Sequence, residues 1–521
     1  MRDKAPSGCV HQGHGIPKKI NQATENTMRY ISTRGGDNEG VSAAYAIKTG
    51  LAKDGGLYMP ECIPTIDEDE IVALAELDYV ERAAAILYKF LDGFEYEEIY
   101  EDALGAYGGG KFNPCPAPIT DIGDGRYMLE LWHGPTCAFK DMALQIMPRL
   151  FVRSLKKCGE ERTALILVAT SGDTGKAALE GYRDVAGTKV QVFYPTGGVS
   201  GIQKLQMQTQ EGGNLSVMGI EGNFDDAQSG VKRIFADENM KNELDARGVF
   251  LSSANSINWG RLAPQIVYYI SAYCDLYKAG KIQLGDVIDV TVPTGNFGNI
   301  FAAYIAKKMG LPLGRLVCAS NKNKVLTDFF TTGEYDRRRV LHLTTSPSMD
   351  ILISSNLERL LYLSFGTEVT AKYMYQLATE GRYKVTEEEL AVLCENFAGL
   401  FADEEATAET IKALYEKKNC LIDTHTAVAL NCADRYMTEN KAERIMLVVS
   451  TASPYKFARD VLFAVTGEDI PEGEKALAAL HNTTSVEIPL PLSRLFGLPI
   501  NHSTVIDKAD MEKAVKEFCS D

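Results

Sequence analysis

Residues 164–176 read A-L-I-L-V-A-T-S-G-D-T-G-K, and this stretch sets the pattern for a long part of the chain. The unbroken apolar run is typical of a buried β-strand, and small polar residues then lead into a helical pattern through Tyr182. Repetition of strand, loop and helix predicts an α/β fold with parallel sheets and helices on both faces. Further strands are expected at residues 189–194, 215–220, 249–252, 287–292, 316–319 and 445–449.

The composition bounds the possible partners. The chain has 521 residues, of which 45% are hydrophobic and 24% charged, as in an ordinary globular protein. The net charge of −16 argues against a nucleic acid or an anionic membrane as the main partner. The 11 cysteines are scattered without a CxxC pair, so neither a disulfide framework nor a metal site is indicated. Reduced thiols favour a cytoplasmic location, and no apolar run is long enough to span a bilayer.

A second informative stretch is residues 132–141, W-H-G-P-T-C-A-F-K-D. Lys140 lies here between Phe139 and Asp141, after a run of small and apolar residues. Burial disfavours the ammonium form, lowers the pKa and leaves a nucleophilic amine that can form a Schiff base with an aldehyde cofactor. The alternative is a solvated lysine at the start of a helix, and this stretch alone does not decide between them.

Two loops after predicted strands could bind anions. Residues 295–299, G-N-F-G-N, open a helix, where glycines and free N–H groups suit a phosphate, although a plain strand–helix turn looks the same. Residues 171–176 resemble a Walker A loop but fail as one. Ala177 stands where Ser or Thr is required, and Thr170 stands where the first glycine is required. An ATPase is therefore disfavoured, and the loop suits a carboxylate or a helix cap.

Two further loops carry hydroxyl and amide groups. Residues 253–258, with Arg261 one turn on, combine groups that suit an oxyanion, or cap a helix beside a solvated arginine. In residues 450–454, S-T-A-S-P, a hydroxyl could hydrogen-bond a ring nitrogen, or cap the next element. His133 and His425 have no partner at a fixed spacing, so both are interpreted as structural.

Together these stretches resemble the threonine synthases, fold-type II pyridoxal-phosphate enzymes, in their bacterial and fungal branch. Residues 1–27 match nothing in the family pattern, and the chain beyond about Gly467 matches weakly. The pieces that carry the resemblance occur in the family's order and are S-T-R-G-G (32–36), D-G-G-L-Y-M-P (54–60), H-G-P-T-C-A-F-K-D (133–141), A-T-S-G-D-T-G (169–175), S-A-N-S-I-N (253–258), T-G-N-F-G-N (294–299) and S-T-A-S-P-Y-K-F (450–457).

The resemblance implies a role for each loop. Lys140 would be the catalytic residue, holding pyridoxal 5'-phosphate and then carrying protons. Asp173 would orient its own loop, because an anion does not attract a carboxylate. The remaining implied contacts are Gly295, Asn296, Phe297, Gly298 and Asn299 with the cofactor phosphate, Thr451 with the ring nitrogen, Ser171, Asp173 and Thr174 with the substrate carboxylate region, and Asn255, Ser256 and Arg261 with the substrate phosphate.

The resemblance also implies two parallel-sheet α/β domains and an N-terminal mixed subdomain. The smaller α/β domain is expected to close over the substrate. The expected parts are a flexible extension (1–27, with Met28 as an alternative start), the N-terminal subdomain (28–112), a large cofactor-binding domain (113–160 and 250–466), a small mobile domain (161–249) and a C-terminal segment (467–521).

The implied reaction converts O-phospho-L-homoserine and water into L-threonine and phosphate. Phosphate leaves by γ-elimination and water adds at Cβ, through carbanions that the cofactor stabilises. Two alternatives remain on the same fold: a phospho-lyase that gives 2-oxobutyrate, and a non-catalytic metabolite-binding regulator, which the intact Lys140 disfavours. The expected partner is a small molecule, with no nucleic acid or membrane, for a cytoplasmic monomer or homodimer.

Overall fold

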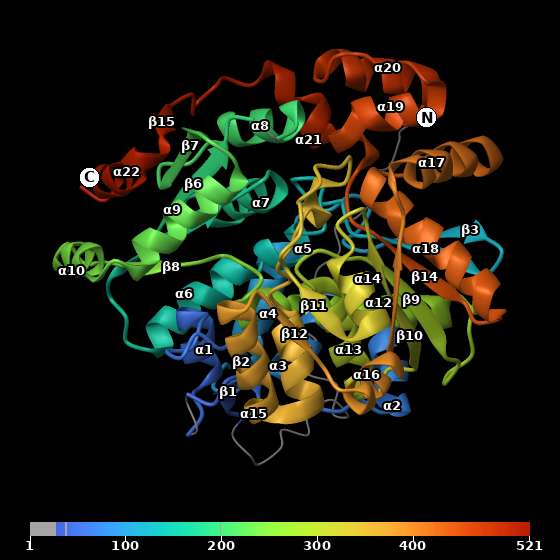
Figure 1. Ribbon diagram of the computed structural model, residues 1–521, viewed down its shortest axis with the longest axis horizontal. Helices are drawn as coiled ribbons and strands as arrows, with labels where there is room; N and C mark the ends of the chain where they lie inside the picture. Colours follow the sequence, from blue (N-terminus) through green and yellow to red (C-terminus); the bar gives the residue numbers. More distant parts are fainter. Residues whose placement is uncertain (1–27, 37–38, 198, 521) are drawn as a thin grey trace, which may run out of the picture.

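Two α/β sheets form the frame of the computed structural model, which describes residues 28–36, 39–197 and 199–520 (Figure 1). The expected extension, residues 1–27, lies outside the described residues. Within the described part, no helix combines the length and the apolar character needed to cross a membrane.

The larger sheet has six strands in the order β13-β10-β9-β14-β4-β3. All neighbours are parallel except β3 and β4, which form an antiparallel hairpin at one edge. β9 and β14 lie inside the sheet and are fully buried because helices cover it, as expected for apolar strands of this kind. The strands are β3 (Ile119–Gly123), β4 (Arg126–Glu130), β9 (Ile288–Pro293), β10 (Leu313–Ser320), β13 (Phe397–Phe401) and β14 (Met446–Ser450).

The smaller sheet has five parallel strands in the order β15-β7-β6-β5-β8. Its last strand comes from the far end of the chain: β15 pairs with β7, and α22 packs on α9 (Figure 1). The elements are β5 (Thr163–Ala169), α7 (Asp173–Tyr182), β6 (Thr188–Pro195), α8 (Gly201–Gln208), β7 (Leu215–Glu221), α9 (Phe224–Ala236), α10 (Glu238–Ala246), β8 (Val249–Ser252), β15 (Val505–Asp507) and α22 (Met511–Phe518).

The N-terminal unit is a small antiparallel pair with helices. Its helices begin at acidic residues: Asp67 and Asp78 each accept a backbone N–H and complete a capping box with a glutamate three residues on. The elements are β1 (Tyr30–Ser32), α1 (Ala43–Thr49), β2 (Tyr58–Pro60), α2 (Glu68–Ala75), α3 (Tyr79–Tyr88) and α4 (Tyr96–Tyr107).

Helices and short turns connect these units. The elements between the sheets are α5 (Asp141–Leu144), α6 (Met147–Lys157), α11 (Trp259–Leu262), α12 (Pro264–Lys278) and α13 (Gly298–Met309). Those that follow β10 are α14 (Val325–Thr332), β11 (Glu334–Asp336), η1 (Pro347–Met349), α15 (Leu357–Thr379), β12 (Arg382–Lys384), α16 (Glu387–Cys394), α17 (Glu404–Lys418) and α18 (Thr424–Asn440). The C-terminal ones are η2 (Pro454–Phe457), α19 (Ala458–Thr466), α20 (Glu474–Thr484), α21 (Leu490–Ser493), η3 (Leu495–Gly497) and η4 (Lys508–Asp510).

Each of the seven apolar runs forms a strand, and the two larger sheets are parallel apart from the β3–β4 hairpin. The small pairs β1–β2 and β11–β12 are antiparallel. The region 366–419 reads as helical in sequence, but it also contains β12 and β13. β13 has the sequence F-A-G-L-F, lies at a sheet edge and is only half-buried, so its pattern is weak. The expected division into domains stays a prediction, and two features lie across it: β8 passes the boundary at 249, and β15 joins the smaller sheet.

Candidate active site

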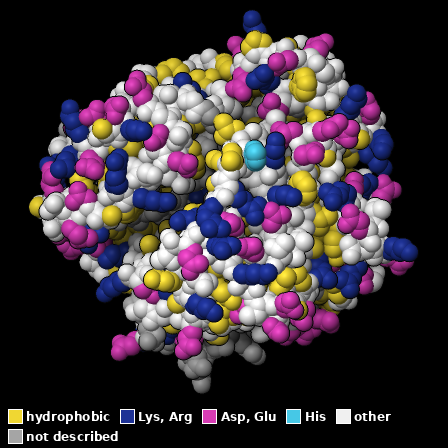
Figure 2. Space-filling view, in the orientation of Figure 1, with side chains coloured by type: hydrophobic (Ala, Val, Ile, Leu, Met, Phe, Trp, Pro, Cys, Tyr) yellow, Lys and Arg dark blue, Asp and Glu magenta, His cyan; other side chains and the backbone are white. Residues whose placement is uncertain are grey.

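A cavity of about 420 Å³ lies where the carboxyl ends of β5, β8, β9 and β14 meet. This is the position at which open parallel sheets bind ligands. Figure 2 shows this face hollowed between its two halves, with Lys and Arg side chains gathered beside the hollow. All thirteen residues to which the sequence assigns a role line the cavity: Lys140, Ser171, Asp173, Thr174, Asn255, Ser256, Arg261, Gly295, Asn296, Phe297, Gly298, Asn299 and Thr451.

Lys140 is the N-cap residue of α5, and backbone hydrogen bonds to the segment after β14 fix its position. Phe139 N donates to Thr451 O over 2.8 Å, and Ser453 N donates to Cys137 O over 3.1 Å. Cys137 has a left-handed backbone (φ 59°), which turns the chain just before the lysine. These bonds bring Lys140 and Thr451 to one wall of the cavity although they are far apart in sequence.

The Lys140 amine is buried among charged groups. Its side chain is 9% exposed, and Nζ lies 3.3 Å from Ser348 Oγ and 3.6 Å from Asp173 Oδ2. Burial lowers the pKa of Lys140 to about 8; Asp173 opposes the shift, while Arg261 adds to it. An amine in this range is an effective nucleophile and proton carrier near neutral pH.

A second buried lysine, Lys456, lies on the far side of Asp173 and has a different role. Its Nζ is 2.6 Å from Asp173 Oδ1 and donates to Thr136 O over 3.0 Å. Gln203 Nε2 also donates to Asp173 Oδ1, over 2.7 Å. Burial works against ionisation of Asp173, but Lys456 and Lys140 hold the pKa of its carboxyl well below the usual range. The carboxylate is therefore already paired, which agrees with an orienting role.

The loop between β9 and α13 has the shape of a phosphate cradle. A Cβ on Gly295 would lie 2.6 Å from Ser348 O, and Phe297 has a left-handed backbone (φ 62°). The first N–H groups of α13 have no partner within the helix, as at any helix N-terminus, and so they can face an anion. Asn299 Oδ1 accepts from Tyr268 and Tyr269, each over 2.6 Å, and its Nδ2 is buried without a partner among the residues that the structure describes. A buried donor of this kind is costly unless a ligand satisfies it.

Arg261 supplies a cation at the loop after β8. Its Nη1 donates to Ala254 O over 2.7 Å, and its Nη2 lies 3.5 Å from Thr174 Oγ1. Burial lowers the pKa of Arg261 to about 10, so the guanidinium stays charged at neutral pH. Among the described residues no carboxylate lies within ion-pair distance of it, so its charge is available to an anion beside Asn255 and Ser256.

The cavity wall also includes residues that the sequence left out of the site. Ser348 and His425 line it, and Lys232 of α9 and Arg337 after β11 add two cations. His133 is elsewhere, stacked on Trp132 with its Nε2 2.6 Å from Glu130. The signal that singles out His425 is the aspartate two residues before it, at the start of α18. The described residues contain no group of His, Cys, Asp and Glu that could hold a metal ion.

Comparisons with known proteins agree with this geometry. Three family models match almost end to end: "Threonine synthase N terminus" at residues 29–107, "Pyridoxal-phosphate dependent enzyme" at 116–451 and "Threonine synthase, C-terminal" at 426–519.

The chain belongs to the threonine synthase family.

Sequence matches to members of this family extend over most of the chain. Threonine synthase of Pseudomonas aeruginosa is 38% identical over 450 residues, 85% of this chain and 91% of the relative. Threonine synthase of Saccharomyces cerevisiae is 34% identical over 87% of this chain and 93% of the relative. Threonine synthase-like 1 of Macaca fascicularis is 38% identical over 489 residues, and the match spans 91% of this chain but 63% of that protein.

Solved threonine synthases share the fold. The structure of PLP-bound threonine synthase from Brucella melitensis matches with a TM-score of 0.83 at 35% identity, over 95% of this chain and 100% of that one. The yeast threonine synthase gives a TM-score of 0.83 at 32% identity, over 95% and 99%. The predicted fold-type II architecture and the family resemblance are therefore confirmed, and the cofactor of this family is pyridoxal 5'-phosphate. The amine of Lys140, the cradle at Gly295 and the unpaired Asn299 Nδ2 fit that group.

Proposed function

We propose that this chain is a threonine synthase that converts O-phospho-L-homoserine and water into L-threonine and phosphate. One observation carries the proposal: a single cavity holds a buried amine of lowered pKa, a phosphate cradle, and a second loop whose arginine has no carboxylate within ion-pair distance among the described residues. Anion-binding groups on two different loops are what a phosphorylated cofactor and a phosphorylated substrate require.

The residues of the cofactor end have distinct tasks. Pyridoxal phosphate, when bound, supplies an electron sink for negative charge at the substrate's Cα and Cβ. Lys140 holds the cofactor and then carries protons to and from these carbons, since its pKa near 8 allows both protonation states. Residues 295–299 hold the cofactor phosphate, and Thr451, beside Lys140, supplies a hydroxyl for the ring nitrogen.

The residues of the substrate end bind and orient. Asn255, Ser256 and Arg261 would hold the phosphate that leaves, and the charge of Arg261 would stabilise it. Ser171 and Thr174 offer hydroxyl groups to the substrate carboxylate at the N-terminus of α7, while Asp173 orients that loop. The smaller sheet carries this loop, so its approach to the larger sheet would exclude water.

The setting proposed for the enzyme is the cytoplasm, as a monomer or homodimer with a small-molecule substrate. The cysteines of the described part are free thiols, which suits a reducing compartment. The net charge of −16 disfavours binding to nucleic acid.

Product identification tests the proposal. Purified chain loaded with pyridoxal phosphate and given O-phospho-L-homoserine should release phosphate and threonine in equal amounts. Formation of 2-oxobutyrate without threonine would instead assign a phospho-lyase, and no product would favour a metabolite-binding regulator. Lys140→Ala should abolish turnover and covalent cofactor attachment, measured by intact mass after borohydride reduction.

A further inference from the structure

Ser348 touches both functional parts of the cofactor end. Its Oγ is 3.3 Å from Lys140 Nζ, closer than the nearest carboxylate oxygen at 3.6 Å. Its carbonyl oxygen occupies the space that a side chain on residue 295 would need, so it closes the wall of the phosphate cradle. The position of this one residue in η1 therefore sets the surroundings of the amine.

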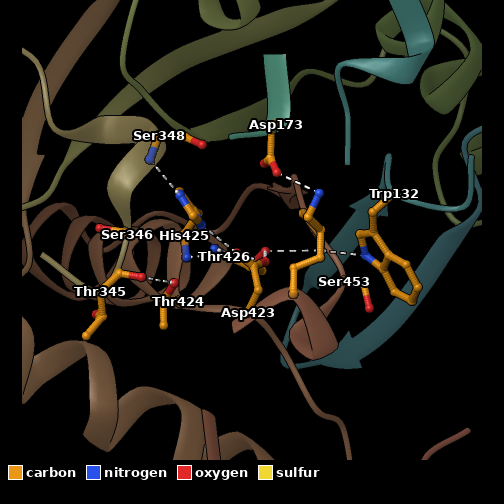
Figure 3. A network of polar contacts seen from close by, with 12 residues as sticks. Trp132, Asp173, Thr345, Ser346, Ser348, Asp423, Thr424, His425, Thr426 and Ser453 are labelled. Atoms are coloured by element: carbon orange, nitrogen blue, oxygen red, sulfur yellow. Dashed lines mark hydrogen bonds and ion pairs between the residues drawn. The ribbon is translucent and has the colours of Figure 1, made fainter. Parts of the chain in front are cut away.

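A histidine holds η1 in place through its backbone. Ser348 N donates to His425 Nε2 over 3.2 Å, and His425 Nδ1 lies 2.9 Å from Asp423 Oδ1 (Figure 3). An ionised carboxylate can only accept, so the Nδ1 atom carries the proton and Nε2 is left as the acceptor. The Asp423 carboxylate thus fixes the tautomer that the Ser348 N–H requires.

Further hydrogen bonds fix Asp423 itself. Its other oxygen accepts from the Thr426 hydroxyl, which lies 3.1 Å from Ser450 Oγ, and Trp132 Nε1 donates to Ser450 Oγ over 3.0 Å. The network joins α18, the last residue of β14 and the segment that leads to Lys140 (Figure 3). Asp423 caps α18 through the N–H groups of His425 and Thr426, and the cap needs no contact between His425 and the cavity wall.

We propose that the buried Asp423–His425 pair positions Ser348 as the hydrogen-bond partner of Lys140, so that Ser348 is a further catalytic residue and His425 a positioning residue. The role in turnover rests on the proposed function. The hydroxyl accepts from the ammonium form of Lys140 and donates to the neutral amine, and it keeps its own proton throughout. It therefore holds Nζ in one place while protons move between Lys140 and the substrate carbon.

The first test uses the full chain without cofactor, so that it does not depend on any reaction. The rate at which acetic anhydride modifies Lys140 is followed against pH by peptide mass spectrometry. The charged groups that face Nζ (Asp173, Arg261 and Lys456) stay unchanged. Ser348→Ala removes an acceptor for the ammonium form of Lys140. The midpoint of the plot of modification rate against pH should therefore fall by about half a pH unit to one pH unit. Ser348→Thr keeps a hydroxyl and should restore the midpoint.

The second test separates positioning from general loosening. His425→Phe should move the midpoint in the same direction as Ser348→Ala, and His425→Gln, whose amide oxygen can accept from Ser348 N, should move it less. Thr424→Val is the matched control. It removes the hydrogen bond that Thr424 Oγ1 donates to Thr345 O over 2.7 Å. This bond also connects α18 to the segment before η1, and Thr424 is the residue next to His425. The control should leave the Lys140 midpoint unchanged.

Turnover provides an independent readout. In the loaded enzyme Ser348→Ala should lower kcat by about 10-fold to 100-fold with little change in KM, because its contact is with the amine. An unchanged midpoint in Ser348→Ala, or equal shifts in His425→Phe and Thr424→Val, would overturn the proposal. If His425→Phe fails to fold, the comparison of Ser348→Ala with Ser348→Thr decides whether the Ser348 hydroxyl sets the pKa of Lys140. A midpoint that shifts as expected in a chain that makes no threonine would refute the proposed function and leave the positioning of Lys140 standing.

Discussion

Lys140 and Lys456 are two buried lysines on either side of one carboxylate, Asp173, and their contacts separate their roles. Lys456 is fully occupied by Asp173 and the Thr136 carbonyl, whereas Lys140 is farther from the carboxylate and lines the cavity. A tight ion pair keeps an amine charged and immobile, while a looser contact leaves a nucleophile. The two lysines are therefore distinguished by their distances to the Asp173 carboxylate, 3.6 Å for Lys140 and 2.6 Å for Lys456.

Gly295→Ala tests the cradle at this scale. The added Cβ would lie 2.6 Å from Ser348 O, so either the cradle or η1 must shift. We expect the dissociation constant for pyridoxal phosphate to rise by about tenfold or more, measured by equilibrium dialysis. Gly497→Ala is the control, because a Cβ there meets nothing within 4 Å. Equal affinities in the two variants would contradict a tight cradle.

Asp141 gives a prediction for the pH dependence of stability. Burial raises the pKa of its carboxyl to about 7, although Thr136 donates two hydrogen bonds to it. The folded chain thus keeps a proton that the unfolded chain releases near pH 4. From about pH 4 to pH 7 this group makes the free energy of unfolding fall as pH rises. Asp141→Asn should remove that contribution, so urea titrations across this range should show a less negative slope than the wild type.

At the scale of elements, the contact between α7 and η2 joins the two sheets. Asp173 is the first residue of α7, beside the smaller sheet, and Lys456 lies in η2, just after β14 of the larger one. Both side chains are almost completely buried, at 3% and 0% exposure. A buried pair adds little net stability, but removal of Lys456 leaves the Asp173 carboxylate in a region of low polarity with only the looser contact to Lys140, at 3.6 Å.

Lys456→Met should therefore destabilise the protein by about 3–5 kcal/mol in urea unfolding. The double variant Asp173→Asn with Lys456→Met should recover much of this loss, because it removes the carboxylate charge as well. A single variant that costs less than about 1 kcal/mol would show that Lys140 or water replaces Lys456 as the partner of Asp173.

At the scale of the whole molecule, the C-terminal segment belongs to the smaller sheet. β15 extends the sheet beside β7, and Met511 and Val515 of α22 are buried against α9 (Figure 1). Gly230 of α9 lies against Met511, whose sulfur occupies the place of a side chain. The end of the chain therefore covers an edge and a face that would otherwise be exposed.

Val515→Asp should destabilise the smaller sheet selectively. A buried, unpaired carboxylate costs about 3–5 kcal/mol, so hydrogen exchange should rise in β5, β6 and β7 before it rises in β9 and β14. Val505→Asp is the matched control, with the same change at a side chain that is 47% exposed. It should stay within about 0.5 kcal/mol of the wild type. Uniform exchange across both sheets would contradict a separate small unit.

The sequence alone determined the alternation of strands and helices and the loops that form the cavity. Apolar runs record burial directly, and the carboxyl ends of parallel strands meet at one edge, so residues 295–299 and Arg261 could be placed at one edge. The family resemblance implied that Lys140 joins them, and all of them line the cavity. Only the tertiary structure decided the contacts between distant segments. Ser348 has no local pattern that marks it, and the aspartate before His425 marks a helix start but does not reveal the contact of His425 with Ser348. The pairing of Asp173 with Lys456 depends on how the two sheets approach, and β15 is too short and exposed to be read as a strand. These features follow from strand order and packing, which no short stretch of sequence records.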